Sequence, residues 1–182
     1  AATCASGAGE PERAKAFWVR CSEAAPDFAE GYRGLGATLA QLGQLAEAEA
    51  AYGRLTELRP DDIDAHHHRG LVLQRLGRYA SAEASQRAAL ALEPGHVGAR
   101  YHLGAVLHDQ RRLDEAEAAY HEALAADPQC AMASNSLGNL LCERGRFDEA
   151  EEAYRQALLA QPQFPEALNN LRSEEHTSEL QS

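Results

Sequence analysis

The sequence lacks the common motifs of catalysis. Its 182 residues contain no GxSxG, no phosphate-binding P-loop, no HExxH and no GxGxxG after a strand, and no strand is predicted. Each of these motifs supplies a nucleophile, a phosphate cradle or a zinc ligand, so their absence argues against the corresponding chemistry. We therefore expect a protein that is not an enzyme and that needs no cofactor.

Long apolar runs and an excess of positive charge are missing as well. No stretch approaches the roughly 18 apolar residues that are needed to cross a bilayer. Lysine and arginine together number 17 against 28 acidic residues, for a net charge of −11, whereas binding to nucleic acid calls for a basic stripe. We expect neither a membrane nor a nucleic acid among the partners.

Cysteines are few and are not paired in sequence. Cys4, Cys21, Cys130 and Cys142 form no CxxC pair, and no histidine pair stands beside them at a zinc-like spacing. We expect reduced, structural cysteines and, from them, a cytoplasmic location. Cys21 is predicted to be a small buried apolar residue, because its repeat register is shared by Leu55, Ala89, Ala123 and Ala157.

What the chain does have is an internal repeat of 34 residues. Residues of the same type return at this interval: Gly36, Gly70, Gly104 and Gly138; Ala48, Ala82, Ala116 and Ala150; and Pro26, Pro60, Pro94, Pro128 and Pro162. Between the prolines, apolar residues recur at helical spacing in two blocks per repeat. Each repeat therefore reads as a helix, a tight turn and a second helix that ends before a proline.

This helix-turn-helix unit resembles the tetratricopeptide repeat (TPR). The resemblance implies an all-α solenoid, an alpha-alpha superhelix of antiparallel helix hairpins. First helices are expected near 29–42, 63–76, 97–110, 131–144 and from 165, and second helices near 11–24, 45–58, 79–92, 113–126 and 147–160. The repeats would span 1–28 (truncated), 29–62, 63–96, 97–130 and 131–164, with 165–171 beginning another.

The small residues have a packing role in this prediction. We expect the backbones of the paired helices to approach closely at the repeated glycine and alanine, where glycine costs about 1 kcal/mol of helix propensity. Gly43, Gly77 and Gly145 should end first helices in the left-handed conformation, with Arg111 in the equivalent place. The aromatic residues of the second helices should fill the space toward the following repeat; they are Trp18, Tyr52, Tyr120 and Tyr154.

Both ends of the sequence interrupt a repeat. There is no initiator methionine, and Ala1 falls in the middle of a first helix, so we expect a fragment of a longer protein. The segment 172–182, RSEEHTSELQS, departs from the repeat and matches an in-frame translation of a widely used short-read sequencing adaptor. We interpret it as non-biological read-through; the alternative is a solvated capping helix.

The repeat at 63–96 carries three unusual residues. His66 replaces the packing residue matched by Tyr32, Arg69 replaces a leucine, and Gln86 replaces a tyrosine. We expect this repeat to open first in hydrogen exchange. An equally acceptable interpretation is that Arg69 extends its charged end to water while Gln86 forms a local hydrogen bond.

The resemblance implies that the first helices form the inner, concave wall of the superhelix, and this wall is the predicted binding site. It offers hydrogen-bonding groups and small apolar surfaces with little net charge, which suits an extended peptide. The residues expected to line it are Arg33, His67, His68, Leu71, Gln74, Tyr101, His102, His108, Asn135, Ser136, Asn139, Asn169 and Asn170. A metal ion shared by His68 and His102 is an alternative, but these two lack further ligands and no metal site is expected.

Two known uses of the family fit poorly. Of the residues that form the carboxylate clamp of chaperone-binding members, this sequence matches only Arg33. Of the asparagine ladder of O-linked N-acetylglucosamine transferases, it cleanly matches only Asn170. The sequence predicts a non-catalytic scaffold that binds a protein or peptide along its groove. The alternative is a substrate-presenting arm of a larger transferase, either O-GlcNAc-transferase-like or a sulfotransferase.

Overall fold

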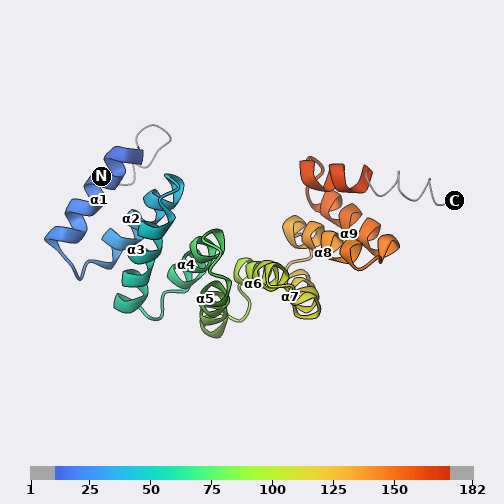
Figure 1. Cartoon of the computed structure of the whole chain (residues 1–182), viewed down its shortest axis with the longest axis horizontal. Helices are drawn as coiled ribbons and strands as arrows, with labels where there is room; N and C mark the ends of the chain where they lie inside the picture. The colour runs from blue at the N-terminus through green and yellow to red at the C-terminus, as the bar shows by residue number, and fades with distance from the viewer. Residues whose placement is uncertain (1–10, 173–182) are drawn as a thin grey trace. The chain divides into compact units, whose positions relative to one another are not determined.

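The computed structural model describes residues 11–172, and all regular structure in that range is helical (Figure 1). The helices are α1 (Pro11–Ala24), α2 (Ala29–Gln41), α3 (Leu45–Leu58), α4 (Ile63–Arg75), α5 (Tyr79–Leu92), α6 (Val97–Asp109), α7 (Leu113–Ala126), α8 (Ala131–Glu143) and α9 (Phe147–Ala160). A further helix covers 165–172. The prediction of an all-α array of helix hairpins is confirmed.

The second helices begin and end where the repeat register predicts, and the first helices end one residue earlier. The part of a first helix predicted at Ala1 and most of the adaptor-like segment lie outside the described residues. Arg172, the first residue of that segment, is the last residue of the helix at 165–172.

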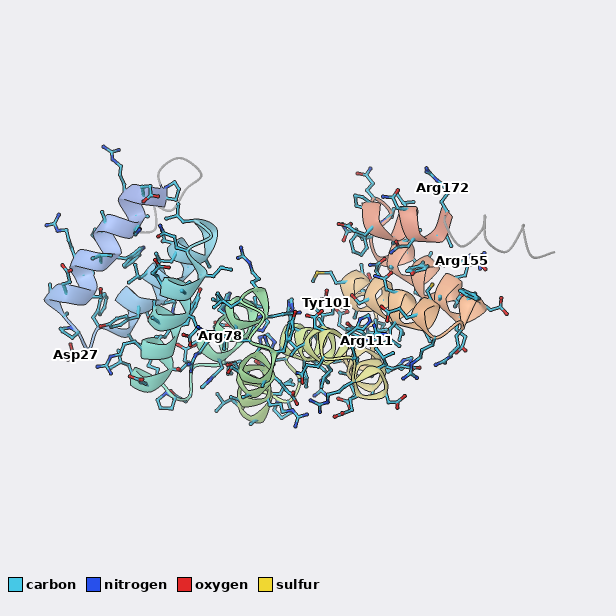
Figure 2. All side chains as sticks on the ribbon, in the orientation of Figure 1. Asp27, Arg78, Tyr101, Arg111, Arg155 and Arg172 are labelled. Atoms are coloured by element: carbon cyan, nitrogen blue, oxygen red, sulfur yellow. The ribbon has the colours of Figure 1, made fainter. Side chains whose placement is uncertain are left out.

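Left-handed residues close the first helices, as predicted. Gly43, Gly77 and Gly145 have φ angles of 74°, 70° and 71°, and Arg111 has 62° at the equivalent place. A side chain is costly in this conformation, which explains why glycine holds three of the four positions. The exposed Arg111 side chain is labelled in Figure 2. These caps reverse the chain within a few residues, so the two helices of each repeat run antiparallel.

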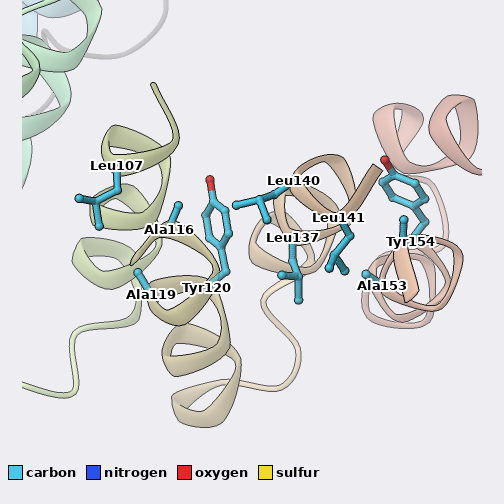
Figure 3. Packing of buried hydrophobic residues seen from close by; sticks show 10 residues of the cluster. Leu107, Ala116, Ala119, Tyr120, Leu137, Leu140, Leu141, Ala153 and Tyr154 are labelled. Carbon is cyan, nitrogen blue, oxygen red and sulfur yellow. The ribbon is translucent and has the colours of Figure 1, made fainter. Parts of the chain in front are cut away.

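The chain divides into two compact units, 1–94 and 95–182. In the first unit, Leu39, Tyr52, Leu55 and Val72 lie at the centre of a core that joins α2, α3 and α4. In the second unit, the core joins α6 to α9. Figure 3 shows its buried residues, among them Tyr120 with Leu140 and Ala153 with Tyr154. Each unit thus buries its apolar residues between adjacent hairpins.

The repeated glycines pack against side chains of the second helix, and Gly104 also lies close to the backbone of the repeated alanine Ala116, as predicted. A Cβ atom added to Gly104 would lie 2.7 Å from the Tyr120 ring, but 3.4 Å from the nearest backbone atom, the carbonyl oxygen of Ala116. Tyr52 lies over Gly36, and Tyr154 over Gly138, in the same way. The glycine is needed because a bulky side chain of the second helix occupies the place of its Cβ.

The prediction that the aromatic residues reach the following repeat holds for Trp18, Tyr52 and Tyr120, the last through a hydrogen bond between its hydroxyl and Ser136. Trp18 lies against Gly34, and the Tyr52 ring stacks on His68 with a centroid distance of 5.8 Å. Tyr52 therefore serves two interfaces, one within its hairpin and one with the next.

Cys21 is only half-buried, so the prediction of a buried residue is wrong for it. Its register mates Leu55, Ala89, Ala123 and Ala157 have no exposed surface. Those four lie on second helices whose partner first helix is among the described residues. Cys21 belongs to α1, the first described helix, whose own partner in the hairpin would fall outside the described residues.

Candidate peptide-binding surface

In the first unit, Arg33 is committed to carboxylates of the protein. Its guanidinium donates to Asp62 and, at 3.1 Å, to Glu30. Asp62 also caps α4 by accepting a hydrogen bond of 3.0 Å from the backbone N–H of Ala65. Burial alone would lower the pKa of Arg33, but its hydrogen bond to Asp62 and the charge of that group raise the pKa above its usual value. Arg33 therefore stabilises the junction between two repeats, and its charge is already neutralised.

His67 and His68 adjoin each other on α4 but have different partners. His67 Nδ1 lies 2.9 Å from Oε1 of Gln86, and Gln86 donates back to the His67 carbonyl at 3.2 Å. His68 Nδ1 lies 2.7 Å from the carbonyl oxygen of Asp64. Because both acceptors are carbonyl oxygens, both imidazoles carry the proton on Nδ1. The Nε2 atom of the exposed His68 is then an acceptor that faces solvent.

The three unusual residues of the 63–96 repeat all have partners. Gln86 is fully buried and pairs with His67, Arg69 donates to Glu49 at 2.8 Å, and His66 Nε2 lies 2.9 Å from the carbonyl oxygen of Pro60. The local hydrogen bond predicted for Gln86 is confirmed. Leu71 and Gln74, also predicted for the wall, are half-buried on α4.

In the second unit, α6 contributes an aromatic pair and a charged cluster. The rings of Tyr101 and His102 meet edge to face with centroids 4.6 Å apart, and Tyr101 is labelled in Figure 2. His108 and Arg111 both contact Glu143 of α8, at 3.0 Å and 2.6 Å. Burial tends to raise the pKa of Glu143, but the hydrogen bonds from Arg111 and His108 lower it below its usual value. Glu143 stays ionised and ties one repeat to the next.

A network of three asparagines connects α8 to the helix at 165–172. The side-chain amide of Asn170 donates to Oδ1 of Asn139 at 2.9 Å and to Oδ1 of Asn135 at 3.1 Å. Tyr154 of α9 donates its hydroxyl to the same Asn139 oxygen at 2.8 Å. Asn135 is 7% exposed, and Asn139 and Asn170 are half-buried. The network thus fixes the orientation of three amides at the surface.

The orientation of these amides leaves specific groups toward solvent. Since the Oδ1 atoms of Asn135 and Asn139 accept from within the protein, their NH₂ groups point the other way. The Oδ1 atom of Asn170 is likewise on the side opposite its donating NH₂. Within residues 11–172, these NH₂ groups and this oxygen have no hydrogen-bond partner. The surface therefore presents two fixed donors and one fixed acceptor.

The remaining predicted residues have mixed surroundings. Ser136 is hydrogen-bonded to the hydroxyl of Tyr120, whose pKa is raised mainly by burial. Asn169 is exposed, next to Asn170. His68 and His102, the alternative metal pair, belong to different units. Across the described range, no three His, Cys, Asp or Glu side chains come together as a metal site would require.

Tyr154 belongs to the network although the sequence prediction assigned it only to packing. A buried tyrosine hydroxyl usually has a hydrogen-bond partner. Tyr154 lies sixteen positions after Gly138 and the same number before Asn170. The packing of its ring over Gly138, which adjoins Asn139, is what brings its hydroxyl to the asparagines.

Comparison with known proteins decides the family. A tetratricopeptide repeat model matches residues 68–131 and 109–167, and a TPR repeat model matches 38–77. Together these matches cover well over half of the sequence. The chain belongs to the tetratricopeptide repeat family. No helix of residues 11–172 has the length and apolar character that a membrane span requires.

Solved structures of other TPR proteins are similar over most of their length. The TPR protein YrrB, described as having an unusual peptide-binding site, is 26% identical, with a TM-score of 0.76 over 92% of this chain and 87% of YrrB. MamA from Desulfovibrio magneticus RS-1 is 22% identical, with a TM-score of 0.81 over 90% and 93%. TTC0263 of Thermus thermophilus, a thermophilic TPR protein, is 21% identical, with a TM-score of 0.75 over 95% and 94%. Likeness at the lower identities establishes the fold alone. No curated protein matches the sequence.

Proposed function

We propose that this TPR protein is a non-catalytic interaction scaffold that binds an extended polypeptide on its first helices. The observation that carries the proposal is the network of Asn135, Asn139 and Asn170, with its two outward donors and one outward acceptor. The NH₂ groups of Asn135 and Asn139 would bind peptide carbonyl oxygens, and the Asn170 oxygen would bind a peptide N–H.

The chemistry of the surface favours main-chain recognition. An extended peptide offers donors and acceptors at regular intervals, whatever its sequence. Amides held in place by Tyr154 lose little side-chain entropy on binding, so each hydrogen bond keeps more of its free energy. Phosphate or carboxylate recognition is less favoured, because Arg33 is already paired with Asp62 and Arg111 with Glu143.

The same mode of binding extends to the other predicted residues. In the first unit, the exposed His68 offers an acceptor, and Leu71 offers apolar surface on the same helix. In the second unit, Tyr101 and His102 offer aromatic faces next to hydrogen-bonding groups. The aromatic side chains of the second unit would select among peptides that the asparagines of the same unit bind through the main chain. The peptide-binding site printed in the description of YrrB supports a peptide as ligand.

The alternative, a substrate-presenting arm of a transferase, gains no support from the relatives named above. Residues 11–172 are used for hairpin packing, and the outward groups described here suit binding better than a reaction.

The proposal is tested by selecting peptides from a random display library on the full chain and measuring their affinity by calorimetry. Asn139→Ala removes the residue that holds Tyr154, Asn170 and one outward donor. We expect it to weaken a selected peptide by about tenfold, the loss of one to two hydrogen bonds.

The matched control is Gln163→Ala, which removes an exposed amide from a turn outside the network. It should leave the affinity unchanged. Equal effects of the two variants, or a library that yields no binder, would refute the proposal.

A further inference from the structure

One position of the first helix decides whether the adjacent hairpin interior is filled. The equivalent residues are Tyr32, His66, Arg100 and Ser134, at intervals of one repeat. Tyr32 packs against the core of its hairpin, and its hydroxyl is hydrogen-bonded by Arg54 of the second helix. Arg100 forms an ion pair with Glu122, which stands where Arg54 stands in its own repeat. In both repeats, a long side chain bridges the two helices.

The bridge is missing in the repeat at 131–164. Ser134 is too short to reach Gln156, the residue equivalent to Arg54 and Glu122. Gln156 instead donates to its neighbour Glu152 at 2.7 Å. An open pocket of about 290 Å³ lies beside Ser134. Its apolar wall is formed by Leu124, Leu137, Leu141 and Ala153; the last three are seen together between α8 and α9 in Figure 3.

An unsatisfied hydroxyl is buried beneath the floor of this pocket. Ser134 is 1% exposed, and its Oγ has no hydrogen-bond partner within the described residues. A buried hydroxyl without a partner is unusual and unfavourable. The pocket also has room for a ring, since a dry aliphatic cavity of about 150 Å³ binds benzene.

We propose that this pocket binds the side chain of a tyrosine from a partner protein. The ring would lie on Leu137 and Leu141, and the phenol hydroxyl would reach the side-chain amide of Gln156, the register mate of the Arg54 that is hydrogen-bonded to Tyr32. Within the same chain, Tyr32 is the register mate of Ser134 and packs, with Leu35, against the core that contains Leu39; Leu35 and Leu39 are the register mates of Leu137 and Leu141. A phenol is therefore the group that this fold already accommodates there. The site shares no residue with the asparagine network and goes beyond the function proposed above.

The test uses p-cresol, the analogue of the tyrosine side chain, and toluene, its counterpart without the hydroxyl. Each is titrated into the full chain while the methyl resonances of Leu137 and Leu141 are followed by NMR. We expect saturable shifts with p-cresol and about three- to tenfold weaker binding of toluene, the effect of one hydrogen bond. Absence of saturable shifts, or equal binding of the two probes, would overturn the proposal; the first result indicates a pocket that holds water only.

Variants of Ser134 make the test specific. Ser134→Tyr fills the pocket as Tyr32 does, and it should abolish p-cresol binding while raising the thermal midpoint. His66→Tyr is the matched control, since it makes the same change at the equivalent place of another repeat and should leave p-cresol binding unaltered. Undiminished binding by Ser134→Tyr would contradict the proposal.

Two further variants separate this site from others. Gln156→Ala removes only the amide that would bond the phenol hydroxyl, so it should bind p-cresol no better than toluene even if the tyrosine variant fails to fold. Asn139→Ala, which should weaken the selected peptides, should bind p-cresol as the unmodified chain does. Loss of p-cresol binding in Asn139→Ala would refute the independence of the two sites.

Discussion

Replacing Gly138 by alanine should destabilise the protein, although alanine is the better helix former. The Cβ atom would lie 2.5 Å from Cε1 of Tyr154, and a contact below 3.0 Å forces atoms to move. The ring must therefore shift by at least the difference, 3.0 − 2.5 = 0.5 Å. Tyr154 is 2% exposed and its hydroxyl is bonded to Asn139, so the ring has little freedom to do so.

The opposing contributions can be compared. Overpacking a dense interior costs about 1 to 3 kcal/mol, and weakening the bond between Tyr154 and Asn139 adds about 1 kcal/mol. The gain in helix propensity is about 1 kcal/mol. We expect the free energy of unfolding to fall by about 1 to 3 kcal/mol, measured by urea denaturation.

Gly53→Ala is the matched control, because Gly53 lies inside α3 and no atom crowds the position of its added Cβ. Its added Cβ would meet the Arg69 guanidinium at 3.6 Å, an ordinary van der Waals distance. Only the propensity term remains, so this variant should be more stable by about 1 kcal/mol. A Gly138→Ala protein that is as stable as Gly53→Ala would refute the proposed packing of tyrosine on glycine.

Three further perturbations test other contacts. Gly145→Ala should lower the free energy of unfolding by about 1 kcal/mol through backbone strain alone, since no neighbouring atom lies within 4 Å of the added Cβ. Arg111→Gly should raise the free energy of unfolding by less than this amount, because it also removes the exposed ion pair with Glu143. Urea denaturation measures both. His67→Ala leaves the Oε1 atom of the fully buried Gln86 without its donor and should cost about 1 to 3 kcal/mol in the same assay. Burial raises the pKa of Tyr52 from 10.0 to about 12. The contribution of its neutral hydroxyl to stability should therefore be complete below pH 10 and lost as the pH rises through 12. Circular dichroism measures this loss, with Tyr52→Phe as the reference.

The helices were predictable because the repeat supplies the same information several times. The left-handed geometry of Arg111 followed from its alignment with Gly43, Gly77 and Gly145, although arginine by itself gives no such signal. The repeat register could not tell that a side chain of the second helix lies over each of these glycines, because that depends on how the two helices pack. The prediction that the 63–96 repeat is the least protected in hydrogen exchange stays a prediction.

The candidate site was predictable as a set of first-helix positions, but not in its internal bonding. Register alone places Asn135, Asn139 and Asn170 on one face. It does not reveal that one amide bridges the other two, nor that Arg33 is neutralised by Asp62, the N-cap residue of α4. The Ser134 pocket depends on how far one side chain reaches, which only packed coordinates reveal.

The central claim is that fixed asparagine amides bind the main chain of a peptide. It is tested most directly by recording the side-chain amide resonances of Asn135 and Asn139 while a selected peptide is added. We predict that both NH₂ resonances move with the binding isotherm of the peptide, and that a peptide of scrambled sequence with the same composition moves them less. Saturating peptide that leaves both resonances in place would contradict the account.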